Sequence, residues 1–88
     1  MEILRRASAG TMESSDAYVE VEPRESGIDI ELESVVIGQF GDAIRSTVMD
    51  VLASLQVKNA GVRVVDRGAL ECVIRARVET ALLRAKED

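Results

Sequence analysis

The sequence contains no histidine and no tryptophan, and its only aromatic residues are Tyr18 and Phe40. Histidine is the side chain that most often works as a general acid or base near neutral pH, and it is the commonest metal ligand. The single cysteine, Cys72, can form no disulfide within the chain, and without histidine it cannot complete a tetrahedral zinc site. These absences disfavour most catalytic classes and predict that the chain holds no metal.

Cations are also in deficit, because 11 Lys and Arg residues stand against 16 Asp and Glu residues, for a net charge of −5. Binding to a phosphate backbone requires clustered cations, and base stacking requires aromatic side chains. No apolar run approaches the ~20 residues of a membrane span, and the first residues are too polar for a signal peptide. We therefore expect neither nucleic acid nor a membrane as a partner, and a cytoplasmic location.

A chain of 88 residues has room for one hydrophobic core. Residues 7–15 are small and rich in hydroxyl groups, which is typical of a flexible arm or, at most, a short edge strand. The organisation that we expect is an N-terminal arm at residues 1–15 followed by a single α+β domain at residues 16–88.

Two segments of the predicted domain alternate between apolar and polar residues, which indicates half-buried strands at 16–22 and 28–33. Turn residues lie between them, so the two strands are predicted to pair as a hairpin. One face of this hairpin would then be acidic. That face is expected either to be solvated or to dock a basic partner surface, and it consists of Glu20, Glu22, Asp29, Glu31 and Glu33.

From Ile37 to Leu55 the apolar residues recur every three or four positions, which predicts an amphipathic helix with Phe40 and Ile44 at the centre of its buried stripe. Ser34 is the expected N-cap of this helix. The chain is predicted to exit the helix at residues 58–61, where Asn59 or Gly61 could adopt the left-handed conformation that ends helices.

A short strand is expected at residues 62–65, followed by a second helix whose apolar stripe runs from Leu70 to Leu82. The order strand, strand, helix, strand, helix predicts a small two-layer α+β sandwich, a split βαβ or ferredoxin-like variant. The third strand should lie parallel to the second, with both helices on the apolar face of the sheet.

Ser14 and Ser15 stand between the carboxylates of Glu13 and Asp16 at the edge of the predicted domain. A serine nucleophile needs a base and a group to orient that base, and neither is visible in the sequence. A serine that receives a group from another enzyme needs only exposure, mobility and small neighbours, and both hydroxyls meet these conditions. Cys72 is expected to be a small, partly buried hydrophobic residue on the flank of the second helix, and not a reactive thiol.

The chain resembles the acyl carrier protein, or gamma subunit, of citrate lyase over nearly its whole length. Four blocks carry the resemblance: AGTMESSD at residues 9–16, QFGDAIRSTV at 39–48, DVLA at 50–53 and DRGALECVIRAR at 66–77. Ordinary acyl carriers differ, because they resemble a four-helix bundle with an Asp-Ser-Leu motif.

The resemblance implies that Ser14 carries phosphoribosyl-dephospho-coenzyme A through a phosphodiester bond. It also implies a carrier without catalytic residues of its own, whose partners are a prosthetic-group transferase and the alpha and beta subunits of citrate lyase. The family usually has glycine after the modified serine, whereas this chain has Ser15, so on chemistry alone a second hydroxyl competes.

Two other interpretations remain open, the first a carrier of the same kind and the second a protein of another class. The acyl carrier subunit of malonate decarboxylase bears the same kind of prosthetic group, and a ferredoxin-like interaction module would bind its partner without covalent cargo. An autonomous enzyme is the weakest alternative, since the sequence supplies no catalytic constellation.

Overall fold

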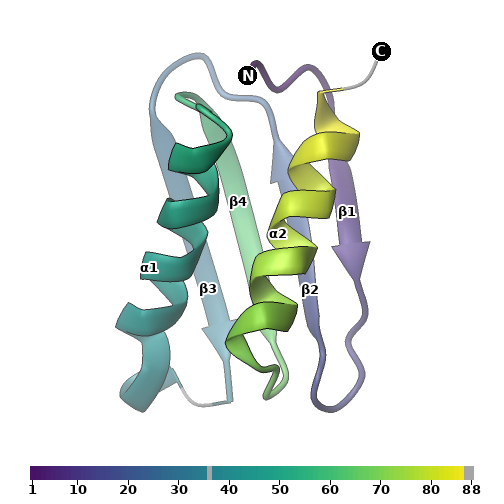
Figure 1. Ribbon diagram of the computed structural model, residues 1–88, viewed down its shortest axis with the longest axis vertical. Coiled ribbons are helices and arrows are strands. Elements are labelled where there is room, and N and C mark those ends of the chain that lie inside the picture. Colours follow the sequence, from purple (N-terminus) through teal and green to yellow (C-terminus); the bar gives the residue numbers. More distant parts are fainter. Residues whose placement is uncertain (36, 87–88) are drawn as a thin grey trace.

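The computed structural model describes residues 1–35 and 37–86, the side chain of Ile37 excepted. Four strands and two helices follow one another along the chain: β1 (Ala7–Gly10), β2 (Ala17–Glu22), β3 (Ile28–Ser34), α1 (Ile37–Ser54), β4 (Ala60–Asp66) and α2 (Glu71–Ala85). Both helices lie on the same face of one four-stranded sheet (Figure 1). The predicted two-layer α+β fold is confirmed, and of the two forms considered for the N-terminal segment, residues 7–10 take that of an edge strand.

The strand order β1-β2-β4-β3 corrects the predicted hairpin. β2 and β3 are consecutive in sequence but do not pair with each other, because β4 lies between them, antiparallel to β2 and parallel to β3. The parallel pairing of β3 and β4 is as predicted. A central position suits the β4 sequence, since six of its seven residues are buried, whereas β3 alternates between partly buried and exposed residues as an edge strand does.

The core is built mainly from branched aliphatic side chains, which pack well on a pleated surface. Val19 and Val21 of β2 and Val64 of β4 are at most 1% exposed, and they face the helices. The helices contribute further fully buried side chains, among them Val48 and Leu52 of α1 and Val78, Ala81 and Leu82 of α2. Neither of the two helices described is long and apolar enough to cross a bilayer.

Two residues expected in the buried stripes are exposed. Phe40, in the first turn of α1, is 48% exposed, and Leu70, which directly precedes α2, is 72% exposed. Periodicity identifies the face of a helix but not where the neighbouring elements end. The buried part of α1 begins one turn after Phe40, at Ile44, and that of α2 begins at Ile74.

The expected ends of α1 also differ. Ser34 is the last residue of β3 and is no N-cap, since α1 begins at Ile37 and the Ser34 hydroxyl donates to the carboxylate of the buried Asp66 at 2.8 Å. At the other end, the left-handed residue is Gln56, with φ of 57°, and not Asn59 or Gly61. Gly61 belongs to β4.

Candidate functional site

The loop between β1 and β2 carries the two candidate serines at the lower end of the molecule in Figure 1. A turn spans Glu13 to Asp16, in which the Asp16 N–H donates to the Glu13 carbonyl at 3.1 Å. Ser14 is exposed, and its hydroxyl makes no hydrogen bond within the part of the chain that the structure describes. Its oxygen is therefore accessible to a reagent that arrives from solvent.

The loop is held in place through Asp16. Its carboxylate accepts hydrogen bonds from Arg77 Nε at 3.1 Å and Nη2 at 3.0 Å, and from the Thr11 hydroxyl at 2.7 Å. Hydrogen bonds from Arg77, then from Thr11 and from the Ala17 N–H, lower the pKa of Asp16 from 3.8 to about 2. Asp16 is therefore fully ionised near neutral pH and anchors the loop to α2.

Ser15 adopts a left-handed conformation with φ of 66°. Side chains other than glycine carry a conformational cost in this region, so glycine would adopt the Ser15 conformation more readily. The Ser15 N–H donates to the Arg67 carbonyl at 2.8 Å, so the backbone on the C-terminal side of Ser14 is tied to the β4–α2 junction. Ser14 and Ser15 are both exposed, so accessibility alone does not separate them.

Gly10 sets the start of the loop. Its φ is 92°, and a Cβ atom built on it would overlap the carbonyl oxygen of Ala17 on the neighbouring strand. Only glycine allows β1 and β2 to approach each other this closely. Gly10 and the Asp16–Arg77 pair therefore fix the two ends of the segment that presents Ser14.

The loop can accept a covalently attached group. The Ser14 hydroxyl is exposed and makes no hydrogen bond within the described part of the chain. The carboxylate of Asp16, two residues later, is paired with the Arg77 guanidinium. The residues present thus fit a prosthetic group that another enzyme attaches, and none of them forms a base for self-modification. Cys72, expected to be partly buried, is exposed.

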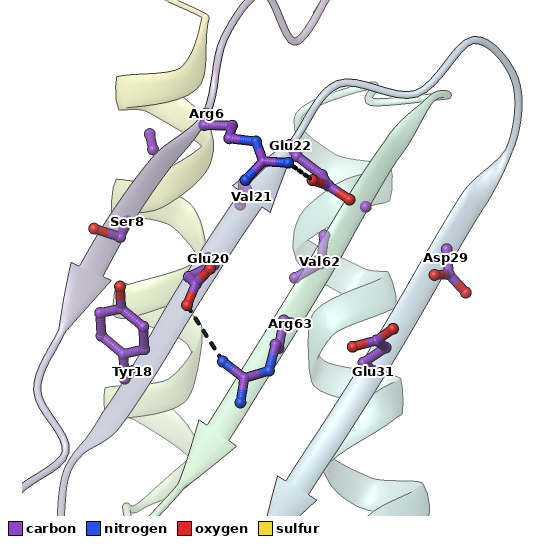
Figure 2. A pocket seen from close by; sticks show the side chains of 12 residues that line it. Arg6, Ser8, Tyr18, Glu20, Val21, Glu22, Asp29, Glu31, Val62 and Arg63 are labelled. Carbon is purple, nitrogen blue, oxygen red and sulfur yellow. Dashed lines mark hydrogen bonds and ion pairs between the residues drawn. The ribbon is translucent and has the colours of Figure 1, made fainter.

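The five carboxylates singled out in the sequence do share the sheet face opposite the helices, but an arginine stands among them. Arg63 of β4 lies between β2 and β3 and pairs with Glu20 at 3.3 Å and with Glu33 at 3.9 Å. Figure 2 shows the Glu20–Arg63 pair, with Asp29 and Glu31 on the adjacent strand.

Arginines also reach this face from its margins, since Arg6 pairs with Glu22 at 2.9 Å and Arg24 with Asp29 at 3.8 Å. The repulsion expected from a β2–β3 hairpin is therefore reduced. The face encloses a shallow depression of about 370 Å³, lined in part by Tyr18, Glu20 and Arg63.

A second depression, of about 560 Å³, lies between the two helices on the opposite side of the sheet. Phe40 and Ala43 of α1 line one wall, and Ala69 and Ile74 line the other. Charged side chains, those of Asp50, Glu71 and Arg75, line it as well.

Sequence reasoning did not identify three residues that shape the Ser14 loop: Gly10, Arg67 and Arg77. The positive φ of Gly10 could have been suspected from its place between two strand-like segments. The other two have no signal in the sequence, since one contributes only its carbonyl oxygen and the other bonds to a residue 61 positions away.

Comparison with known proteins gives a consistent result. Residues 4–85 match the family described as malonate decarboxylase delta subunit (MdcD). The chain is 53% identical to a citrate lyase acyl carrier protein of Escherichia fergusonii, with 99% of this chain and 91% of that protein covered. It is 51% identical to that of Haemophilus influenzae, with 100% and 92% covered.

Among solved structures, a Pseudomonas malonate decarboxylase hetero-tetramer in complex with malonate contains a similar fold. The TM-score is 0.83 at 21% identity, with 94% of this chain and 86% of that chain covered. The structural match extends over the sheet and both helices, and the sequence matches include the loop that presents Ser14. The chain therefore belongs to the citrate lyase acyl carrier protein family.

Proposed function

We propose that this chain is the acyl carrier subunit of citrate lyase, and that Ser14 bears its phosphoribosyl-dephospho-coenzyme A group. The observation that carries the proposal is an exposed hydroxyl, without a hydrogen bond among residues 1–35 and 37–86, on a turn held at both ends in a chain about half identical to citrate lyase acyl carrier proteins. When bound, the group supplies a terminal thiol that holds acetyl and citryl as thioesters.

In this function Ser14 is a tether. Its oxygen forms the bond to phosphorus while its proton passes to a base of the transferase. The phosphoanhydride bond of the activated donor breaks at the same phosphorus, and the outer phosphate group departs with the bonding electron pair. Once the group is attached, tethering raises the effective concentration of the cargo at the alpha subunit, which acts as transferase, and at the beta subunit, which acts as lyase. The chain itself needs no catalytic residue, and it would work in the cytoplasm.

The anchors described above determine how the tether is presented. Arg77 and Asp16 hold the C-terminal side of the turn, and Gly10 fixes its start, so the attachment point keeps its position when the arm moves. The Ser15 N–H donates to the Arg67 carbonyl, and the Ser15 backbone is in the left-handed conformation. This difference in backbone setting favours Ser14 over Ser15 as the site.

We propose a separate role for the acidic sheet face formed by Glu20, Glu22, Asp29, Glu31 and Glu33. Although arginines compensate some of its charge, the face lies on a chain with a net charge of −5. Its field would steer the carrier toward basic partner surfaces and allow it to leave them readily, because such contacts are screened by salt.

The test is the intact mass of the protein after co-expression with the prosthetic-group transferase of a citrate-fermenting bacterium. The parent should gain one coenzyme-A-derived group, Ser14→Ala should gain none, and Ser15→Ala should be modified like the parent. Modification of Ser14→Ala with loss in Ser15→Ala would move the site by one residue. An unmodified parent would contradict the carrier function.

The second candidate function is that of the acyl carrier subunit of malonate decarboxylase, because the matched family is described by the name of that enzyme's delta subunit. The two functions differ in the enzyme subunits that accept the loaded carrier. Turnover of citrate by added citrate lyase alpha and beta subunits, with no malonate decarboxylation by the corresponding malonate enzymes, would decide for citrate lyase.

A further inference from the structure

Large apolar side chains are exposed mainly at the end of the molecule that presents Ser14. Within residues 1–35 and 37–86, the side chains of this kind are Leu4, Met12, Val35, Phe40, Met49 and Leu70. Met12 lies in the Ser14 loop, Val35 follows β3, Phe40 is in the first turn of α1, and Leu70 precedes α2. These segments all lie at the lower end of the molecule in Figure 1, from the start of α1 on the left to the loop between β1 and β2 on the right, and we call the four residues the end patch.

The β4–α2 junction connects the members of the end patch. Val35 N–H donates to the Asp66 carbonyl at 3.4 Å, and the Ser14 loop donates to the Arg67 carbonyl at 2.8 Å. Phe40 lines the depression between the helices, together with Gly68 and Ala69 of the same junction. The patch is thus built on one ordered framework, and through Phe40 it adjoins the depression between the helices.

Leu70 is poorly suited to its position if the chain acts alone. It occupies the N-cap of α2 without a side-chain hydrogen bond to the helix, and 72% of its surface is exposed. Serine or aspartate would satisfy a free N–H group of the first turn, so leucine favours neither helix stability nor hydration at this site. A contact with another molecule would bury the Leu70 side chain and so give leucine an advantage at this position.

The charges around the end patch indicate the chemistry of that molecule. Glu13, Asp42 and Glu71 are exposed near its members. The nearby guanidinium of Arg75 pairs with Glu71 at 2.8 Å and with Asp50 at 3.5 Å. With Asp50 included, four carboxylates in this region stand against two guanidinium groups, those of Arg75 and Arg67. The rim is therefore more negative than positive, and it complements a basic rim on a partner.

We propose that the end patch is the surface by which the carrier docks on the enzyme subunits of citrate lyase, against an apolar partner surface with a basic rim at the entrance to each active site. The inference rests on the proposed function, because a group tethered at Ser14 must enter a partner site from this end. Docking there would bury Phe40 and Leu70 and exclude water around the entrance.

The test measures binding of the full-length, unmodified chain to the purified alpha and beta subunits of citrate lyase, each in turn, by isothermal titration calorimetry. The patch variant combines Phe40→Gln with Leu70→Ser. The control variant combines Leu4→Gln with Met49→Gln, which removes two apolar side chains of similar exposure elsewhere on the surface. The patch variant should raise Kd at least about tenfold for both subunits, and the control should stay within about twofold.

Leu70→Ser alone separates docking from folding. As a better N-cap it should raise the urea midpoint of the chain, while its affinity for the partner subunits falls. Equal binding by the parent and the patch variant would overturn the proposal. So would binding that requires the attached group, because the arm and not the patch would then make the contact.

The outcome is independent of attachment at Ser14. A parent that gains the prosthetic group but docks equally well without the end patch would leave the carrier function intact and remove only this surface. A parent that is never modified would contradict the carrier function itself.

Discussion

Arg77 of α2 and Asp16, which directly precedes β2, form a two-point hydrogen-bonded ion pair across 61 residues of sequence, with donor–acceptor distances of 3.1 and 3.0 Å. Such paired bonds fix orientation as well as distance, because the planar guanidinium matches the two carboxylate oxygens. The pair attaches the segment that presents Ser14 to the helix that packs on the sheet, so the stability of the site depends on a contact remote in sequence.

The first prediction concerns pH. The pKa of Asp16 is lowered from 3.8 in the unfolded chain to about 2 in the folded chain. The ionised Asp16 carboxylate therefore stabilises the fold fully at a pH above the unfolded pKa, and this stabilisation is lost as the pH falls through the folded pKa. Asp16→Asn should therefore be less stable than the parent near neutral pH, and the difference should shrink between about pH 4 and pH 2. Urea unfolding over this range measures it.

Arg77→Met supplies the companion variant for that experiment. It should remove the largest part of this pH dependence, since Thr11 and the Ala17 N–H also lower the pKa of Asp16. Adding Asp16→Asn to it should cost less stability than Asp16→Asn costs in the parent, because the two residues act as one unit. Additive losses in the double variant would show that the pair does not hold the loop.

Gly10 and Gly27 give a matched test of close strand approach. Both have positive φ, 92° and 84°, but only at Gly10 would a Cβ atom meet neighbouring backbone. Gly27→Ala should lower the free energy of unfolding by about 1 kcal/mol, from conformation alone. Gly10→Ala should lower it by about 2 kcal/mol or more, because β1 must also shift. Chemical denaturation measures both free energies. Similar losses in the two variants would mean that β1 can shift away from β2 at little cost in free energy.

Phe40 and Ile44 lie one turn apart on α1, yet they differ in burial, at 48% and 6% exposed. Ile44→Ala should lower the free energy of unfolding by about 2–5 kcal/mol, since it leaves a cavity in the core. Phe40→Ala should cost less than about 1 kcal/mol, because solvent already reaches the ring. A large loss at Phe40 in denaturant melts would place this residue in the core after all.

The end of α1 can be improved. Gln56 is in the left-handed conformation, and the Val57 N–H donates to the Leu52 carbonyl at 2.9 Å, while the Gln56 N–H donates to Ala53 at 3.1 Å. This pattern is a Schellman motif, in which glycine is the preferred left-handed residue. Gln56→Gly should raise the free energy of unfolding by up to about 1 kcal/mol, and Gln56→Ala should not. Thermal melting of the three proteins distinguishes the cases.

The steering role of the acidic sheet face predicts a kinetic effect. Replacing Glu20, Asp29 and Glu31 by their amides should slow association with the citrate lyase subunits and flatten its dependence on salt. The control carries the same change in net charge at exposed carboxylates elsewhere, in Glu2→Gln, Glu25→Gln and Glu79→Gln. Stopped-flow mixing measures the association rates. Equal rates in the two triple variants would show that net charge, and not the acidic sheet face, determines the rate of association.

Local patterns were sufficient for much of the fold. Strict alternation predicted β2 and β3, and the helical period predicted α1 and α2 to within a few residues, because both periods follow from backbone geometry. The pairing of strands was not accessible in this way. Nothing in the segments around Tyr18 or Ile30 shows that β4 separates them, since strand order depends on packing of the whole sheet.

The candidate site shows the same division. Small, hydroxyl-rich neighbours predicted that Ser14 and Ser15 are exposed, and the structure places both in an exposed turn. Only the resemblance to a known family selected Ser14 from the two. The ion pairs of Arg63 with Glu20 and Glu33 could not be foreseen, because they arise from the central position of β4. The exposure of Leu70 was missed because its period matches the buried face of a helix that begins one residue later.

The central place of β4 also constrains how the protein can be made on a ribosome. β1 and β2 are complete by residue 22, but the strand that must join β2 to β3 ends at Asp66. Until that segment has left the exit tunnel, the nascent chain presents one hairpin and one separate strand, each with unpaired backbone groups along an edge. Most of the domain must therefore be synthesised before its sheet can close, and the turn that bears Ser14 reaches its final setting only when Arg67 and Arg77 arrive after it.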